Sequence, residues 1–247
     1  SGGRALIYTE DPVRVEAVMV ESLHLQEREL ADAMLEGIER HGVTTMYAPP
    51  TLIYGMLGDP TASGRNYTSL RHLIYSAAPM RPDQIRAAQR MFGPVIETAY
   101  GQVEAPQIIT AMRAAELERD ENLASIGRPS PVAEVGIMAP TGELVPNGDT
   151  GEIVVRGPLV MNGYLDRPEM TNQTLVDGWL HTGDLGELTD EGYLKIIGRK
   201  KEIMINAAGK NLSPNNIEEA IKTKSPIIGQ LLVYADDRPY VSALVVL

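Results

Sequence analysis

The most informative part of this chain is the stretch DGWLHTGD at residues 177–184, followed by GRKKE at residues 198–202. A carboxylate on a Thr-Gly-Asp turn accepts hydrogen bonds from two neighbouring hydroxyls, which suits the diol of a ribose. A nearby arginine reaches the same sugar or its phosphate. Asp184 and Arg199 are therefore candidate ribose ligands. Either segment alone also fits an aspartate that caps a turn, or one charge of a solvated basic run.

Two further segments lie upstream: ETAYGQVE at residues 97–104, and GEIVVRGP at residues 151–158, which continues to MNGY at residues 161–164. In this order and approximate spacing, the four segments resemble the adenylate-forming superfamily of acyl- and aryl-CoA ligases, luciferases and peptide-synthetase adenylation domains. ETAYGQVE is similar to its Tyr-Gly-x-Thr-Glu signature. The segment AGKNLSP at residues 208–214 resembles a loop of the long-chain fatty-acyl-CoA ligases. The resemblance covers nearly the whole chain.

Composition limits the classes of function that fit the chain. The 247 residues are 43% hydrophobic, which is enough for a sizeable core, and the net charge of −11 disfavours wholesale nucleic-acid binding. The absence of cysteine excludes disulfides and thiolate chemistry. No apolar run approaches the roughly 20 residues that span a bilayer, and no basic-then-apolar leader opens the sequence. We expect a cytoplasmic protein.

The first part of the chain alternates short apolar runs with amphipathic stretches, which favours an α/β fold with a parallel sheet and covering helices. Ligands of such sheets bind beyond the carboxyl ends of the strands. Residues 76–79 and 100–101 each follow a predicted strand, so we expect them to lie close together. The predicted strands are residues 4–8, 43–48, 72–76 and 95–99, and the predicted helices are residues 29–40, 51–57 and 82–92.

From about residue 125 the pattern changes to short apolar runs separated by Gly, Pro, Asn and Asp, which predicts a small β-rich subdomain. Its predicted strands include residues 133–138, 152–156 and 193–197. A helix over residues 215–222 and a hairpin of residues 231–235 and 240–247 follow. The resemblance implies a partial α/β adenine- and acyl-binding subdomain, from the second half of the large adenylation domain. After it come the β-rich subdomain with the ribose-binding turn and the start of a mobile α+β C-terminal domain. The predicted bounds of these three parts are residues 1–124, 125–198 and 199–247.

Both ends of the sequence run directly into apolar strands, as expected of a piece of a longer protein. The family's glycine-rich phosphate loop is expected before Ser1, and its C-terminal adenylation lysine after Leu247. The chain is therefore either a fragment or a short paralogue that lacks two catalytic parts.

The resemblance implies roles for several residues of the α/β part. The backbone at Ala77 and Ala78 is expected to line an adenine pocket, and Tyr100 offers adenine a flat face. Gly101 allows close approach of the backbone to the nucleotide. Glu104 is the expected Mg²⁺ ligand, because that ion prefers carboxylate and phosphate oxygens. The alternative for Glu104 is a solvated residue at a helix start.

Further roles follow for the second part. Asp184 is expected to accept both ribose hydroxyls, and Arg199 to contact the ribose or phosphate. Lys201 falls at the family's hinge, about which the C-terminal domain swings between half-reactions. Lys210 is expected on a loop that faces CoA. Val103 departs from the family, which usually has a Thr or Ser hydroxyl there to contact the α-phosphate.

These residues imply ATP-dependent activation of a fatty acid to an acyl-adenylate and its transfer to CoA. The expected cofactors and partners are ATP or AMP, Mg²⁺, CoA and a fatty-acid substrate, without nucleic acid. A fatty substrate is also compatible with peripheral membrane contact. Two alternatives remain: a ligase that delivers the acyl-adenylate to a carrier protein, and a truncated, non-catalytic paralogue that binds an adenylate or a partner. The missing phosphate loop and Val103 favour the latter.

Overall fold

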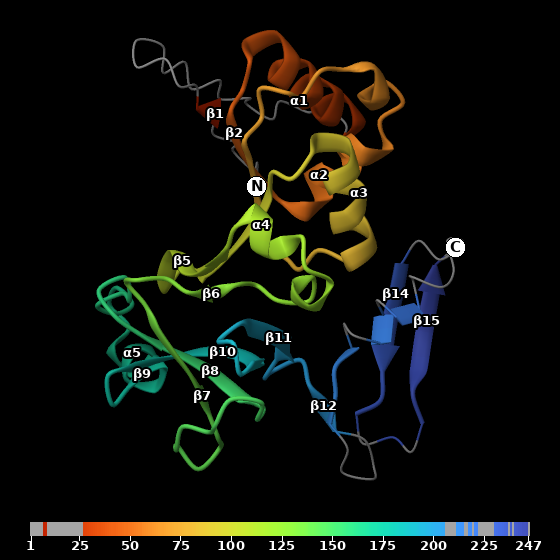
Figure 1. Ribbon diagram of the computed structural model, residues 1–247. Coiled ribbons are helices and arrows are strands. Elements are labelled where there is room, and N and C mark those ends of the chain that lie inside the picture. The colour runs from red at the N-terminus through yellow and green to blue at the C-terminus, as the bar shows by residue number, and fades with distance from the viewer. Residues whose placement is uncertain are drawn as a thin grey trace. The chain divides into compact units, whose positions relative to one another are not determined.

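The computed structural model describes residues 7–8, 27–205, 211–214, 217–218, 220–221, 230–236, 238 and 240–246 (Figure 1). Contacts divide the chain into two compact units, Ser1–Ala133 and Glu134–Leu247. The three-part division made from the sequence stays a prediction.

The first unit contains one six-stranded sheet in the order β1-β2-β3-β4-β5-β6. Its three central strands, β2 to β4, are parallel, as predicted. Both edges are antiparallel, which the sequence did not indicate. The reason at one edge is the two-residue connection from β4 to β5, which is too short for a parallel crossover. The strands are β1 (Ile7–Tyr8), β2 (Thr45–Ala48), β3 (His72–Tyr75), β4 (Ile96–Gln102), β5 (Ala105–Met112) and β6 (Arg128–Pro129).

Three predicted helices form in this unit: α1 (Glu27–His41), α2 (Pro50–Gly58) and α3 (Pro82–Phe92). Proline occupies the first turn of α2 and α3, where its fixed φ fits and no N–H is required. Helix α3 ends at Gly93, whose φ of +87° suits only glycine well. Helix α2 contacts both of the others. Shorter helical segments are α4 (Ala114–Leu117), η1 (Ala62–Gly64) and η2 (Asp120–Asn122).

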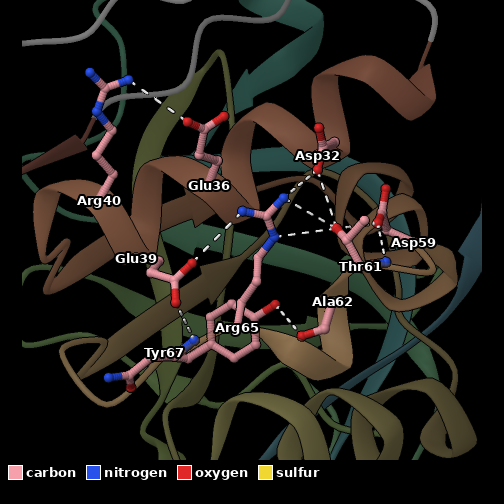
Figure 2. A network of polar contacts seen from close by, with 10 residues as sticks. Asp32, Glu36, Glu39, Arg40, Asp59, Thr61, Ala62, Arg65 and Tyr67 are labelled. Carbon is pink, nitrogen blue, oxygen red and sulfur yellow. Dashed lines mark hydrogen bonds and ion pairs between the residues drawn. The ribbon is translucent and has the colours of Figure 1, made fainter.

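A polar network ties α1 to the segment that leads into β3 (Figure 2). At its centre is Arg65, whose guanidinium lies 2.5 Å from Asp32 and 3.8 Å from Glu39, both on α1. It also donates to the Thr61 hydroxyl. Beneath it, the Tyr67 hydroxyl donates to a backbone carbonyl of η1 at 2.7 Å. The network fixes the loop against the helix by side chains rather than by regular structure.

The second unit begins with an antiparallel sheet in the order β11-β10-β8-β7, with β9 paired to β10. This is the predicted β-rich part. The central strand β10 runs through the Thr-Gly-Asp segment, which the sequence suggested was a turn between strands. The elements are β7 (Glu134–Met138), β8 (Gly151–Arg156), α5 (Pro168–Thr174), β9 (Leu175–Val176), β10 (Trp179–Leu188) and β11 (Leu194–Arg199).

Beyond β11 the described residues form two small antiparallel pairs. Strand β12 (Met204–Ile205) pairs with β13 (Asn211–Leu212), and β14 (Gln230–Tyr234) pairs with β15 (Ser242–Val246). The predicted C-terminal hairpin is therefore confirmed. The predicted helix over 215–222 lies partly outside the described residues, and those described within it are helical. Among the described residues, no helix combines the length and apolarity needed to cross a bilayer.

Candidate functional site

The Thr-Gly-Asp segment forms a bulge inside β10. The register between β10 and β8 shifts between His181 and Leu185, so the residues between them leave the ladder. Gly183 has a φ of +75°, which favours glycine. Thr182 compensates for part of the lost ladder, because its hydroxyl donates to the Ile153 carbonyl at 2.7 Å and accepts from the Asp184 amide at 3.1 Å. The bulge is therefore a defined structure rather than a loose turn.

The structure brings the two predicted ribose ligands together. Asp184 and Arg199 are directly opposite each other on β10 and β11. The Arg199 Nε lies 3.3 Å from the Asp184 Oδ1. The aspartate is buried, whereas 68% of the arginine side chain is exposed. A buried carboxylate paired with an exposed guanidinium is suited to accept hydrogen bonds from hydroxyl groups.

Glu152, at the start of β8, is the centre of the contacts behind this bulge, and the sequence analysis did not single it out. One carboxylate oxygen accepts from the Gly183 amide at 3.2 Å. The other lies 3.0 Å from the His181 Nδ1 and 3.1 Å from the Lys200 Nζ. Burial raises the pKa of Glu152, but hydrogen bonds and charges from His181 and Lys200 outweigh it and hold that pKa below its usual 4.5.

Two residues near the bulge, His181 and Trp179, contact other parts of the same sheet. His181 bonds to Glu152 rather than to a nucleophile. Trp179 packs in a small cluster with Met138 and Val154. The Arg156 guanidinium lies 4.6 Å above the indole ring, which is a cation–π contact.

The candidate adenine and metal residues lie around the β4–β5 hairpin. Tyr100 and Gly101 were expected just past a strand, but β4 continues through them to Gln102, with a register shift there. Strand β4 is longer than predicted because β5 supplies an antiparallel partner for its last residues. Val103 and Glu104 form the hairpin turn, so Glu104 does not begin a helix. The Val103 side chain is 89% exposed, whereas Glu104 is half-buried.

Ala77 and Ala78 follow β3 and are exposed. Tyr75, the last residue of β3, pairs in parallel with Thr98 of β4. Ala77 and Tyr100 are therefore each two residues beyond a paired position, at the same edge of the sheet, as predicted. Ala77 has a φ of +73°, which is unusual for a residue with a Cβ. Such a strained backbone occurs most often at functional sites.

The two remaining candidates follow β11. Lys201 is exposed and lies in the turn directly after that strand. Lys210 lies outside the described residues. The described residues contain no group of three or more acidic, histidine or cysteine side chains with metal-binding geometry. A single carboxylate such as Glu104 still fits Mg²⁺, which commonly takes one or two carboxylates plus phosphate oxygens and water.

Comparison with known proteins identifies the family. The sequence model of the AMP-binding enzymes matches residues 16–165, which is more than half of the chain. The chain belongs to the AMP-binding enzyme family. The chain is 35% identical, over 217 residues, to the medium/long-chain-fatty-acid–CoA ligase FadD8 of Mycobacterium tuberculosis. The match covers 87% of the chain and 38% of that ligase.

Solved structures of adenylate-forming enzymes share the fold of the chain. The amide bond synthetase McbA from Marinactinospora thermotolerans matches with a TM-score of 0.79 and 34% identity, over 87% of this chain and 44% of McbA. O-succinylbenzoate CoA synthetase (MenE) from Bacillus subtilis, in complex with ATP and magnesium, matches with a TM-score of 0.76 and 27% identity, over 87% of this chain and 44% of MenE. The family resemblance and the α/β fold class are thereby confirmed. The chain spans less than half the length of these relatives.

Proposed function

We propose that the chain contributes to an ATP-dependent fatty-acid–CoA ligase, which activates a fatty acid as an acyl-adenylate and transfers the acyl group to CoA. The observation that carries this proposal is the buried Asp184 carboxylate, paired with the exposed Arg199 across the β10–β11 ladder. This is a nucleotide half-site in a family named for AMP binding. Similarity to FadD8 supports a fatty acid as the substrate class.

The proposed chemistry begins when the fatty carboxylate attacks the α-phosphorus of ATP and pyrophosphate leaves. The thiol of CoA then attacks the acyl carbonyl and AMP leaves. Catalysis of this kind depends mainly on positioning and on neutralising phosphate charge. Mg²⁺, when bound, supplies positive charge at the phosphates, and Glu104 is the residue we propose to hold it.

The other roles follow from position. Asp184 and Arg199 bind the ribose, and Tyr100 and the Ala77–Ala78 backbone contact adenine. Lys201 serves as the hinge, and Lys210 faces CoA.

A specific observation favours a second candidate, a non-catalytic adenylate-binding protein. Val103 has no hydroxyl to donate to the α-phosphate. One hydrogen bond to a charged group contributes about 1.5–3 kcal/mol, which corresponds to about one to two decades in rate. Acyl-CoA formation from ATP, fatty acid and CoA, without any carrier protein, would exclude both this candidate and a ligase that delivers to a carrier.

The nucleotide half-site is tested by thermal unfolding with a non-hydrolysable fatty acyl-adenylate analogue. At a hundred times its Kd, a ligand stabilises the folded state by about 2.7 kcal/mol, which raises the Tm of a chain of this size by about 5–10 °C. We expect this shift to disappear in Asp184→Ala. It should persist in Asp190→Ala, a change at an exposed aspartate between β10 and β11. A folded wild-type chain with no shift would overturn the proposed half-site.

A further inference from the structure

Gly183 is held by a closed set of three contacts. Its amide donates to the Glu152 Oε1 at 3.2 Å, and its carbonyl accepts from the Lys200 amide at 2.8 Å. The Lys200 Nζ in turn donates to the Glu152 Oε2 at 3.1 Å. Both peptide groups that flank Gly183 are therefore fixed by residues on neighbouring elements.

Hydrogen bonds, rather than packing, set the conformation at this position. A Cβ built on Gly183 would find no atom within 4 Å, so no neighbouring group presses on it. Its φ of +75° lies in a region that glycine enters and leaves freely. The bulge also removes the ladder partners that β8 would otherwise supply. The direction of the next side chain, Asp184, therefore depends on the contacts made by Glu152 and Lys200, together with the Thr182 hydroxyl that accepts from the Asp184 amide.

Glu152 is suited to this task by its surroundings. Only 11% of its side chain is exposed, so its hydrogen bonds are poorly screened by water. Because an ionised carboxylate only accepts, the His181 Nδ1 at 3.0 Å donates to it. The Lys200 ammonium at 3.1 Å and the lowered pKa of Glu152 keep this side chain ionised at neutral pH.

We propose that Glu152 is a positioning residue that holds the Asp184 carboxylate in the orientation that binds ribose hydroxyls. Through Lys200, it also links the ribose-binding bulge to the residue that precedes the proposed hinge, Lys201. This inference rests on the proposed function, because it assigns Asp184 a ribose to bind. It adds a residue that touches no substrate and acts through the Gly183 peptide.

The test compares AMP with 2′,3′-dideoxy-AMP in calorimetric titrations of the wild-type chain and Glu152→Gln. The substitution keeps the side chain's size and one acceptor oxygen but removes its charge. We expect the Kd for AMP to rise about tenfold, while the Kd for the dideoxy nucleotide changes less than about twofold. Loss of preference for the ribose hydroxyls is a result that general destabilisation would not produce.

Glu187→Gln is the matched control. Glu187 lies on β10, the strand that carries the bulge, and pairs with Lys195 of β11 at 3.4 Å. The substitution therefore makes the same chemical change in the same sheet as Glu152→Gln on β8, but away from the bulge. We expect both Kd values to stay within about twofold of wild type. Equal effects of Glu152→Gln and Glu187→Gln, or equal weakening of both nucleotides by Glu152→Gln, would overturn the inference.

A second measurement needs no nucleotide and separates the two proposals. Amide hydrogen exchange at Gly183, followed by ¹⁵N NMR, should be faster in Glu152→Gln than in Glu187→Gln, because the acceptor of that amide is weakened. Unchanged exchange overturns the positioning role, whereas a wild-type chain that binds no AMP overturns the proposed function. Should Glu152→Gln fail to fold, Lys200→Met at an exposed position removes only the Nζ contact. Lys200→Met should raise the Kd for AMP about threefold. An unchanged Kd for AMP in this variant would contradict the inference.

Discussion

Two charged clusters in this chain have opposite arrangements. In the first unit, the cation Arg65 lies between two acids of helix α1, Asp32 and Glu39 (Figure 2). In the second, the acid Glu152 lies between two basic side chains, His181 and Lys200. The described contacts of Arg65 join a helix to a loop and include no candidate site residue. Those of Glu152 include the backbone beside Asp184.

If Asp184 binds ribose as proposed, similar charge chemistry stabilises a fold in one place and orients a ligand-binding side chain in the other. The two clusters differ in what the central side chain contacts: Arg65 contacts a loop and a helix, whereas Glu152 contacts the backbone beside Asp184. A change in the Arg65 cluster should therefore lower stability and leave nucleotide binding unchanged. A change in the Glu152 cluster should alter nucleotide binding more than stability.

The largest effect is expected at the carboxylate that the Glu152 cluster holds. Asp184→Asn should raise the Kd for AMP at least about a hundredfold, because the amide keeps only one of the two acceptor oxygens and carries no charge, and each hydrogen bond to a charged acceptor contributes about 1.5–3 kcal/mol. Isothermal titration calorimetry measures this change. Asp190→Asn, at an exposed position nearby, provides the control. A loss below about threefold in Asp184→Asn would mean that the bulge does not bind ribose, and the contrast between the clusters would disappear.

Arg65→Met tests the other side of the comparison. The Arg65 side chain is 18% exposed and its acids are 47% and 43% exposed, so solvent screens part of the interaction. We expect the free energy of unfolding in urea to fall by about 1–2 kcal/mol, with the Kd for AMP unchanged.

Arg40→Met is the matched control for that change. Arg40 is on α1, the helix that carries both acidic partners of Arg65, and its pair with Glu36 is 3.7 Å long and largely exposed. Its loss should lower stability by less than about 0.5 kcal/mol. Should Arg65→Met weaken AMP binding as strongly as Glu152→Gln does, the assignment of separate purposes to the two clusters would be wrong.

A smaller effect is expected from pH. The pKa of Glu152 is lowered in the folded protein, so the ionised form stabilises the fold. That contribution is fully present above the ordinary pKa of 4.5 and is lost as the pH falls through the lower folded value. The difference in unfolding free energy between wild type and Glu152→Gln should stay constant from about pH 7 to 5 and shrink towards pH 3. Denaturant titrations at each pH measure it. A difference that grows on acidification would contradict the lowered pKa.

Local signals in the sequence predicted much of the fold correctly. Helix α3 has the predicted bounds, because Pro82 starts it and Gly93 ends it. Strand β5 was missed, because its connection to β4 through Val103 and Glu104 contains no glycine, proline or asparagine to mark a turn. Strand β10 was not predicted, because Thr-Gly-Asp resembles a turn and becomes a bulge only when β8 and β11 flank it.

In the candidate site, too, the sequence predicted what local motifs mark and missed what depends on strand pairing. Motif spacing placed Asp184 and Arg199 near each other, and the ladder pairs them directly. Glu152 was missed because its partners are far away in sequence: His181 is 29 residues on and Lys200 is 48 residues on. Nothing in the local pattern of an acid at the start of an apolar strand reveals such partners. Only the register of three strands brings them together.

The smallest effect concerns backbone strain at two positions with nearly the same φ. One is in the bulge beside the candidate ribose ligand, and the other is at the end of β3, where we expect adenine to bind. Gly183 has a φ of +75° and Ala77 has a φ of +73°. At Ala77 the Cβ makes this conformation unfavourable by about 1 kcal/mol. Ala77→Gly removes that strain but increases the entropy of the unfolded chain, at a cost of about 0.5–1 kcal/mol. The two terms nearly cancel, so the unfolding free energy should change by less than about 0.5 kcal/mol.

Ala78→Gly makes that small net change interpretable. Ala78 is the next residue, is also exposed, and has no positive φ. Its substitution carries the entropy penalty without any relief of strain, and should destabilise the chain by about 0.5–1 kcal/mol. The two variants should therefore differ by about 1 kcal/mol in parallel urea titrations. Equal destabilisation would mean that Ala77 is not strained, and the strain would then give no support for a binding site at the end of β3.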